Sequence, residues 1–197
     1  MAKKKVSRKS SSRSSHSRNP PKSPRQLANL IVTFDPHHLE SAKKEILYLL
    51  EEVKQKARIL SADEGLAHIA VKDARKVVED LEAFSRKSMD KFNHTMKWIP
   101  IDTWCKNSLK EMQNAVKKMV KGIGPEEKWK LDLRTRKLKG KQNEIKLIMD
   151  LTEVVDRKKV DLEHPEKIIK VEIIGNKAGL ALLNHHHLLN LAKLREK

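Results

Sequence analysis

The sequence predicts an α+β protein in which two compact halves follow a basic N-terminal tail. Short aliphatic and β-branched runs, typical of strands, alternate along the chain with segments whose apolar residues recur every three or four positions, typical of amphipathic helices. Apolar residues make up 38% of the 197 residues, which is enough to fill packed cores in one medium domain or two small ones.

The tail, residues 1–26, holds nine Lys and Arg, eight Ser and three Pro but no acidic residue. Such a segment cannot bury enough apolar surface to offset the entropy of ordering, so we expect it to be disordered. It could serve as a nuclear-import signal or as an electrostatic tether. We favour the tether, because contact with a polyanion needs only counterion release.

The first half, residues 27–96, has the predicted order β-α-β-β-α-β. The run LANLIVTF predicts a strand, and Asp35 with Pro36 begins a helix with one apolar face through about Gln55. The run ARILSADEGLAHIAV then predicts a hairpin, and a second amphipathic helix leads to a closing strand over 95–101. Two helices on one side of an antiparallel sheet in this order define a ferredoxin-like domain.

The second half, residues 97–190, also mixes helices with strands. Ser108 and Glu111 have the spacing of a capping box at the start of a helix that Gly122 and Gly124 end. Strands are expected near Val160, over 168–174 and after a turn at 175–179. A further helix is expected before these strands, with an inward stripe formed by Ile145, Ile148, Met149, Thr152 and Val155.

The run EKWKLDLRTRK, residues 127–137, alternates strictly between two kinds of side chain, which predicts a strand with two different faces. The inward face is formed by Trp129, Leu131 and Leu133. The outward face is formed by Lys130, Asp132, Arg134 and Arg136. A patterned cationic row of this kind suits phosphate oxygens spaced along a polynucleotide, although a solvated sheet face has the same pattern.

A formal charge of +17 and an isoelectric point near 9.9 indicate a polyanionic partner, either nucleic acid or an anionic membrane surface. No apolar run approaches the roughly 20 residues of a spanning helix, and no signal core is present. We therefore expect a soluble cytoplasmic protein without a membrane partner. Its single cysteine, Cys105, has no partner for a disulfide or a thiolate zinc site.

No phosphate-binding loop, GxGxxG or HExxH motif is found, and neighbours Asp102 and Lys106 do not establish a base that would activate Cys105. The histidines at 37–38 and 185–187 are adjacent in sequence, so their rings should point in different directions rather than toward one ion. We therefore expect no catalytic residue, no metal, no cofactor and no small-molecule substrate.

The tryptophans Trp98, Trp104 and Trp129 could stack RNA bases, but their apolar neighbours favour core packing. The end of the chain, LLNLAKLREK, predicts a short basic amphipathic helix after the last sheet strand, with a frayed terminus as the alternative. We treat residues 191–197 as a C-terminal tail.

Three blocks, IPIDTWCK, EKWKLDLRTRK and VDLEHPEKIIKVEIIGNKAGLALL, occur in the order seen in the THUMP domain and together resemble it over about residues 97–190. That domain occurs in enzymes of tRNA thiolation, methylation and pseudouridylation. In the 4-thiouridine synthetase family a ferredoxin-like domain packs beside it, and the two together look like a binder of the tRNA acceptor end. The basic tail is not part of the resemblance.

Because no catalytic domain follows, the chain most resembles the stand-alone THUMP proteins that assist tRNA cytidine acetylation. The resemblance implies an adaptor, not an enzyme, that presents tRNA by its acceptor end to a separate tRNA acetyltransferase forming 4-acetylcytidine. A general RNA-binding or ribosome-associated protein without tRNA selectivity is the main alternative, and an enzyme is the third.

The predicted RNA contacts are basic residues of the second half. They are Lys130, Arg134 and Arg136 from the strand, Lys137, Lys139 and Lys141 from the loop after it, Lys146 from the next helix, and Lys170 and Lys177 around the later hairpin. The two arginines should matter most, because a guanidinium is a planar fork that matches a phosphate, whereas a lysine is a mobile point charge.

Overall fold

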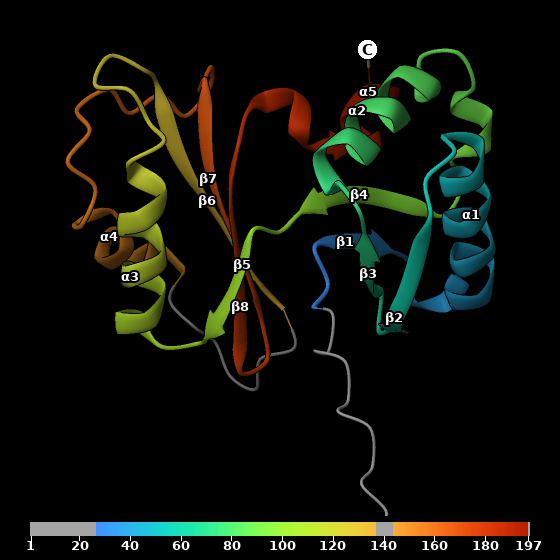
Figure 1. Cartoon of the computed structure of the whole chain (residues 1–197), viewed down its shortest axis with the longest axis horizontal. Coiled ribbons are helices and arrows are strands. Elements are labelled where there is room, and N and C mark those ends of the chain that lie inside the picture. Colours follow the sequence, from blue (N-terminus) through green and yellow to red (C-terminus); the bar gives the residue numbers. More distant parts are fainter. Residues whose placement is uncertain (1–26, 137–143, 197) are drawn as a thin grey trace, which may run out of the picture.

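Two β-sheets face each other across the middle of the molecule, and helices cover the outer side of each sheet (Figure 1). The computed structural model describes residues 27–136 and 144–196. The predicted α+β class is confirmed. The tail for which disorder is predicted, residues 1–26, lies outside the described residues.

The first sheet has the strand order β2-β3-β1-β4-β9, and all its neighbouring strands are antiparallel. Its first four strands, with both helices on one face, form the predicted ferredoxin-like arrangement. The elements are β1 (Leu30–Phe34), α1 (Leu39–Glu52), β2 (Ala57–Asp63), β3 (Leu66–Val71), α2 (Ala74–Ser85) and β4 (Thr95–Pro100), with 3-10 turns at Pro36–His38 and Met89–Lys91.

Local chemistry explains where these elements begin and turn. The Asp73 carboxylate caps α2 by accepting from the backbone N–H groups of Arg75 and Lys76 at 3.0 and 3.1 Å. The hairpin between β2 and β3 turns at Gly65, whose φ of +80° is strained for other residues. A Cβ there would also lie 2.7 Å from the carbonyl oxygen of Phe34, so the position requires glycine.

A buried carboxylate fixes the approach to β4. Glu45 of α1 is 8% exposed and accepts four hydrogen bonds from residues 93–95. They come from the backbone N–H groups of Asn93, His94 and Thr95 and from the Thr95 hydroxyl, over 2.7–2.9 Å. This single side chain therefore satisfies the backbone of the segment that leads into the sheet.

The second sheet has the order β5-β8-β7-β6, with β6 and β7 parallel and the other pairs antiparallel. Its core lies under α3 and α4, and α4 lies on the crossover that a parallel pair requires. The elements are β5 (Thr103–Lys106), α3 (Leu109–Val120), β6 (Trp129–Arg136), α4 (Glu144–Thr152), β7 (Lys167–Ile174) and β8 (Lys177–Leu183).

Two predicted details of this half are wrong. Ser108 precedes α3, but its side chain makes no capping hydrogen bond. The buried residues of α4 are Leu147 and Leu151. Of the predicted stripe, Ile148 and Val155 pack against the same core, whereas Ile145 and Met149 are 73% and 62% exposed. Both stripes of α4 are apolar, so its helical period alone does not determine which one faces the sheet.

The chain returns to the first half at its end. After a 3-10 turn at His185–His187, the short strand β9 (Leu189–Asn190) pairs with β4, and the helix α5 (Leu191–Arg195) follows. Leu191 is completely buried in the first core, so the predicted helix is confirmed and is anchored rather than frayed. The predicted domain boundaries, after residues 96 and 190, assign β9 to the second half and α5 to a tail. In space, β9 belongs to the first sheet and Leu191 of α5 to the first core.

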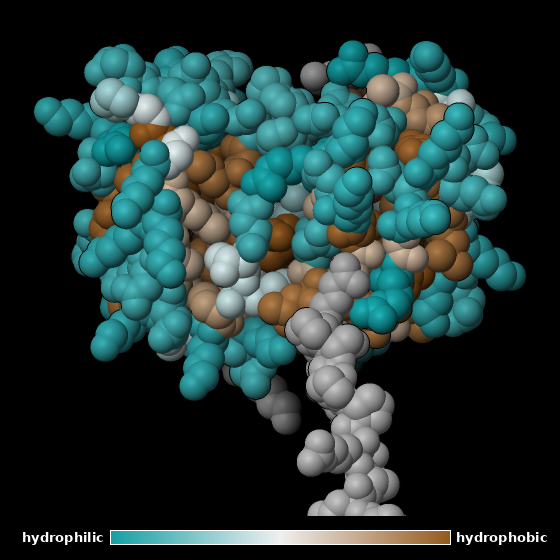
Figure 2. Space-filling view, in the orientation of Figure 1, coloured by the Kyte–Doolittle hydropathy of each residue, from teal (hydrophilic) through white to brown (hydrophobic). Residues whose placement is uncertain are grey.

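The helix-free faces of the two sheets meet in a small apolar cluster. Ile31 and Ile99 of the first sheet pack with Trp104 and Ile174 of the second. In the orientation of Figure 1, Figure 2 shows hydrophilic side chains over most of the surface and hydrophobic ones along the junction of the halves. Among the described residues, no helix has both the length and the apolarity to cross a bilayer.

Candidate nucleic-acid interface

Strand β6 presents different side chains to its two faces, as its alternation predicts. One set is buried against the helices, and it consists of Trp129, Leu131 and Leu133. The other set consists of Lys130, Asp132, Arg134 and Arg136. This second set lies on the helix-free face and therefore points toward the first half of the molecule rather than away from it.

Strand β7 adds two charged residues to the same face, Lys170 and Glu172. The parallel register places them opposite Asp132 and Arg134 of β6. The Lys170 ammonium lies 3.0 Å from a carboxylate oxygen of each acid, and Arg136 donates from Nε to Glu172 at 2.8 Å. Positive and negative charges thus alternate across the two strands. We call the five residues the charge network: Asp132, Arg134, Arg136, Lys170 and Glu172.

Lys170 occupies a different place from the one expected for an RNA contact. Its side chain is only 4% exposed and is ion-paired with both Asp132 and Glu172. Its charge is already compensated by these two acids, so Lys170 holds Asp132 and Glu172 in place and does not contact RNA itself. By contrast, the side chain of Arg134 is 58% exposed and lies 3.9 Å from Asp132, a separation that leaves the guanidinium largely in solvent.

The acid in the middle of the network is held in its charged form. Burial by itself would raise the pKa of Asp132. The nearby cations outweigh burial, Lys170 first and then Arg134 and Lys130, and they hold the pKa of Asp132 below its usual range. Asp132 therefore carries its negative charge at neutral pH.

Lys97 is a cation that the sequence reasoning missed. It lies on β4 next to Ile99 on the face that meets the second sheet, so it comes from the other half of the molecule. Burial lowers the pKa of Lys97, and the positive charges of Lys170, Arg134 and Arg136 lower it further, against an opposing effect of Asp132. Cations from both halves therefore lie close enough to repel one another.

A cavity of about 260 Å³ lies between the sheets beside this charge. Its polar lining comes from both halves and includes Lys97, Lys130, Asp132, Lys170, Asn190 and Lys193. That volume is smaller than the roughly 300–1,000 Å³ of a site for a drug-sized ligand, and it suits a phosphate or a single base. Lys193, on α5, is a second cation that the sequence reasoning did not include.

The remaining predicted contacts do not all join this surface. Lys130 lines the cavity and donates to the carbonyl of Leu162 at 3.0 Å. Lys177 is exposed at the end of the sheet where Arg136 lies. Lys146 is exposed on α4, which covers the opposite side of the sheet, so the structure does not bring it to the others. Lys137, Lys139 and Lys141 lie outside the described residues.

The tryptophans are core residues, as their neighbours predict. Trp98 and Trp129 are 0% and 2% exposed, so neither ring is free to stack on a base. Trp104 is half-buried between the halves and donates from Nε1 to the carbonyl of Ala28 at 2.6 Å. Base stacking is thus unsupported for the first two rings.

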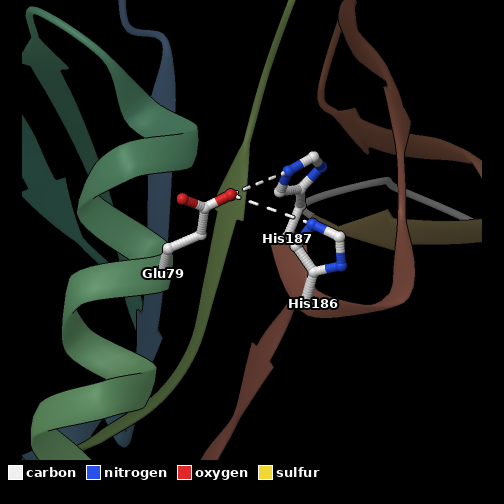
Figure 3. Close-up of side chains that lie close together, drawn as sticks. All are labelled: Glu79, His186 and His187. Carbon is white, nitrogen blue, oxygen red and sulfur yellow. Dashed lines mark hydrogen bonds and ion pairs between the residues drawn. The ribbon is translucent and has the colours of Figure 1, made fainter.

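A second polar cluster joins α2 to the turn before β9, and Figure 3 shows its three side chains, Glu79, His186 and His187. Both Nε2 atoms reach one carboxylate oxygen, at 3.8 Å from His186 and 3.1 Å from His187. The expectation that adjacent imidazoles diverge is therefore wrong here. Three ligand atoms lie within 4.8 Å of one another, which is close enough for a shared metal ion.

The hydrogen bonds of His187 nevertheless argue against a metal. Its Nδ1 accepts from the backbone N–H of Asn184 at 3.2 Å, so the neutral ring carries its proton on Nε2 and donates it to Glu79. A metal would need the lone pair of that same Nε2. We interpret the cluster as a hydrogen-bonded clamp on the C-terminal segment, and the absence of a metal site stays a prediction.

Acidification is expected to weaken this clamp. Burial lowers the pKa of His187, and His186 and Arg75 lower it further, against an opposing effect of Glu79. Because the pKa in the unfolded chain is about 6.5, the unfolded chain takes up the proton first as the pH falls. The stabilisation is complete above about pH 6.5 and is lost toward the folded pKa. Thermal unfolding midpoints recorded across this range should fall with the pH.

The variant His187→Gln should flatten that pH dependence, because Gln does not titrate. The matched control is His37→Gln, which replaces an exposed histidine outside the clamp and should leave the slope unchanged. A slope that is the same in His187→Gln and in the natural sequence would show that the loss of stability arises elsewhere.

Comparison with known families identifies part of the chain. Residues 106–183 match the model of the THUMP domain, so the resemblance predicted from the three sequence blocks is confirmed for this region. A THUMP domain implies RNA binding. The match includes β6, β7 and β8 and hence the whole charge network. A search of curated proteins finds no match.

Solved structures share the fold over most of the chain. TrmN from Thermus thermophilus is 15% identical with a TM-score of 0.51, and the match covers 78% of this chain and 44% of that one. PH1313 from Pyrococcus horikoshii Ot3 is 17% identical with a TM-score of 0.55, over 80% and 54% of the two chains. A possible methylase from Clostridium difficile 630 is 11% identical with a TM-score of 0.50, over 79% and 40%.

At these identities the likeness shows the fold alone, and the chain spans about half or less of each solved protein. The prediction that this protein is not an enzyme is therefore wrong. It rested on the lack of a catalytic domain after the THUMP-like region, yet the same fold forms part of longer proteins that include a possible methylase. An enzymatic role is consistent with this fold.

Proposed function

We propose that this chain binds tRNA at its acceptor end, through the face between the two sheets, and presents it to a centre that modifies tRNA. The observation that carries the proposal is the meeting of cations from both halves at one cavity. Lys97 of the first half and Lys130 of the THUMP half both line this cavity. Burial lowers the pKa of Lys97, and repulsion from Lys170, Arg134 and Arg136 lowers it further. A bound phosphate would relieve that repulsion.

The proposed contacts are the cations that this face presents, namely Lys97, Lys130, Arg134, Arg136, Lys177 and Lys193. The residues Lys137, Lys139 and Lys141 follow β6 directly in the sequence and stay predicted contacts. We leave out Lys146, which lies on the outer side, and Lys170, which is neutralised. The small volume of the cavity favours a chain end with unstacked nucleotides over a duplex, because a duplex cannot enter it.

Removing the 3′-terminal nucleotides from a tRNA is expected to weaken its binding about tenfold or more, since the cavity then loses its occupant. Labelled full-length and truncated tRNA should be titrated with the full chain at one fixed salt concentration, because phosphate contacts make all affinities depend on salt. Equal affinities for the two would instead support the alternative, a general RNA-binding or ribosome-associated protein.

The finer part of the proposal is that the modification is 4-acetylcytidine formed by a separate tRNA acetyltransferase. It is supported by the resemblance of residues 97–190 to THUMP proteins that assist tRNA cytidine acetylation. Deleting the protein from its native cell should remove 4-acetylcytidine from tRNA nucleosides, and the protein should co-purify with an acetyltransferase. A normal 4-acetylcytidine level after deletion would contradict this role. Modified nucleoside formed by the purified chain alone would show that it carries the catalysis itself.

A further inference from the structure

Glu172 stands out on the face between the sheets because it is a completely buried carboxylate. Its oxygens are divided between two cations. Oε2 accepts from Arg136 Nε at 2.8 Å, and Oε1 lies 3.0 Å from Lys170 Nζ in an ionic contact that is not an aligned hydrogen bond. On the same face of β7, Glu172 is flanked by Lys170 on one side and by the apolar Ile174 on the other. Ile174 belongs to the apolar cluster between the sheets.

Packing alone does not explain an acid in this position. Moving a carboxylate out of water is costly, and apolar residues of similar volume often stabilise a fold equally well. The negative charge also lowers the positive potential of a surface that would attract a polyanion. Glu172 therefore costs the protein both folding stability and attraction for a polyanion. We look for its role in the arrangement of its partners.

The arrangement of Arg136 suggests that role. Its side chain is 30% exposed, so it reaches the surface while its Nε is tied to the buried acid. An arginine has five N–H donors, and the two terminal nitrogens carry the four that Nε does not. Fixing Nε sets the plane of the guanidinium before a ligand arrives, which reduces the rotamer entropy that binding would otherwise cost.

We propose that Glu172 is a positioning residue for RNA binding, which orients Arg136 so that its terminal nitrogens take a backbone phosphate of the RNA. Lys170 and Asp132 complete the support by sharing the charge of Glu172 with the rest of the charge network. This inference rests on the proposed function, because it names how one contact of that surface is prepared.

The substitution Glu172→Gln tests the proposal by the sign of its effect. Simple electrostatics predicts tighter RNA binding, because a negative charge is removed from a cationic surface. Positioning predicts weaker binding, by about threefold or more, because Arg136 loses its ion pair with the carboxylate and only one of the two terminal atoms of Gln can accept its N–H. The control Glu163→Gln removes an exposed charge from the edge of the same cavity and should bind slightly tighter. Unchanged or tighter binding by Glu172→Gln overturns the proposal.

A double-substitution cycle separates positioning from a general structural role. If Glu172 acts through Arg136, then Glu172→Gln combined with Arg136→Ala should bind a labelled tRNA as Arg136→Ala does alone, with the same dependence on salt. A further loss in the double variant would mean that Glu172 acts through the fold, and would overturn the inference.

The same measurements separate this inference from the proposed function. Undiminished binding by Arg136→Ala would contradict the proposed contact and the positioning role together. Weakened binding by Arg136→Ala, with Glu172→Gln binding as tightly as the natural sequence, would overturn only the role of Glu172. Far-ultraviolet circular dichroism of each variant should match that of the natural sequence.

Discussion

Replacing Arg134 and Arg136 together by alanine is expected to weaken tRNA binding at least tenfold. Each guanidinium offers charge-assisted hydrogen bonds to a phosphate, and such bonds contribute about 1.5–3 kcal/mol each. The loss of two phosphate contacts to a single strand should also reduce the slope of log affinity against log salt by about 1.4. Titration of a labelled tRNA at several salt concentrations measures both quantities.

The matched control is the double variant Lys110→Ala and Lys117→Ala, which removes the same amount of charge from exposed positions on α3. This helix covers the outer side of the second sheet, so the control should keep nearly all of its affinity. Equal losses in both double variants would show that only net charge matters, and the site assignment would then be wrong. The arginine variant should stay folded because Glu172 keeps its ionic contact with Lys170, and the control should stay folded because Lys110 and Lys117 are exposed.

The substitution Glu45→Gln is expected to lower the free energy of unfolding by about 3 kcal/mol or more. The natural carboxylate accepts hydrogen bonds from residues 93–95 at both of its oxygens. A glutamine offers only one acceptor oxygen, and its NH₂ group would face donors that are then left buried and unsatisfied. Urea unfolding followed by circular dichroism measures the loss.

The control for this prediction is Glu40→Gln on the same helix. Glu40 is exposed and contacts Lys43 at 2.8 Å, and an exposed pair of this kind contributes little, so the change should stay within about 0.5 kcal/mol. A Glu45→Gln variant as stable as Glu40→Gln would mean that water reaches the 93–95 backbone and replaces the lost acceptor.

Local periodicity was enough to predict most elements of this fold, because an alternating or a three-to-four pattern records which side of a segment is buried. It failed in α4, where Ile145 and Met149 compete with Leu147 and Leu151 for the inward side and only contact with the sheet decides. It also correctly predicted the two faces of β6. What β6 faces depends on a second sheet far away in sequence, which no local pattern records.

The same limit explains the errors at the site. Lys97 lies on the opposite face of its strand from the buried Trp98, so the sequence pattern predicts an ordinary exposed lysine. Only the contact between the two sheets places it near Arg134. Lys170 and Glu172 follow the alternation of β7, yet both are buried because their charges compensate each other across strands. Burial of charge is decided by its partners, which pattern reading does not supply.

The pairing of β9 with β4 has a consequence for synthesis. Residues 97 and 98 of β4 can pair with residues 189 and 190 only after those have been synthesised. At roughly 5–20 residues per second, a ribosome adds them about 5–20 s later. During that interval the nascent ferredoxin-like sheet has an open edge strand, and open edges recruit other chains. The first sheet is therefore completed only when Leu189 and Asn190 have been made, and substitutions that remove this pairing should leave the earlier-made part prone to aggregate.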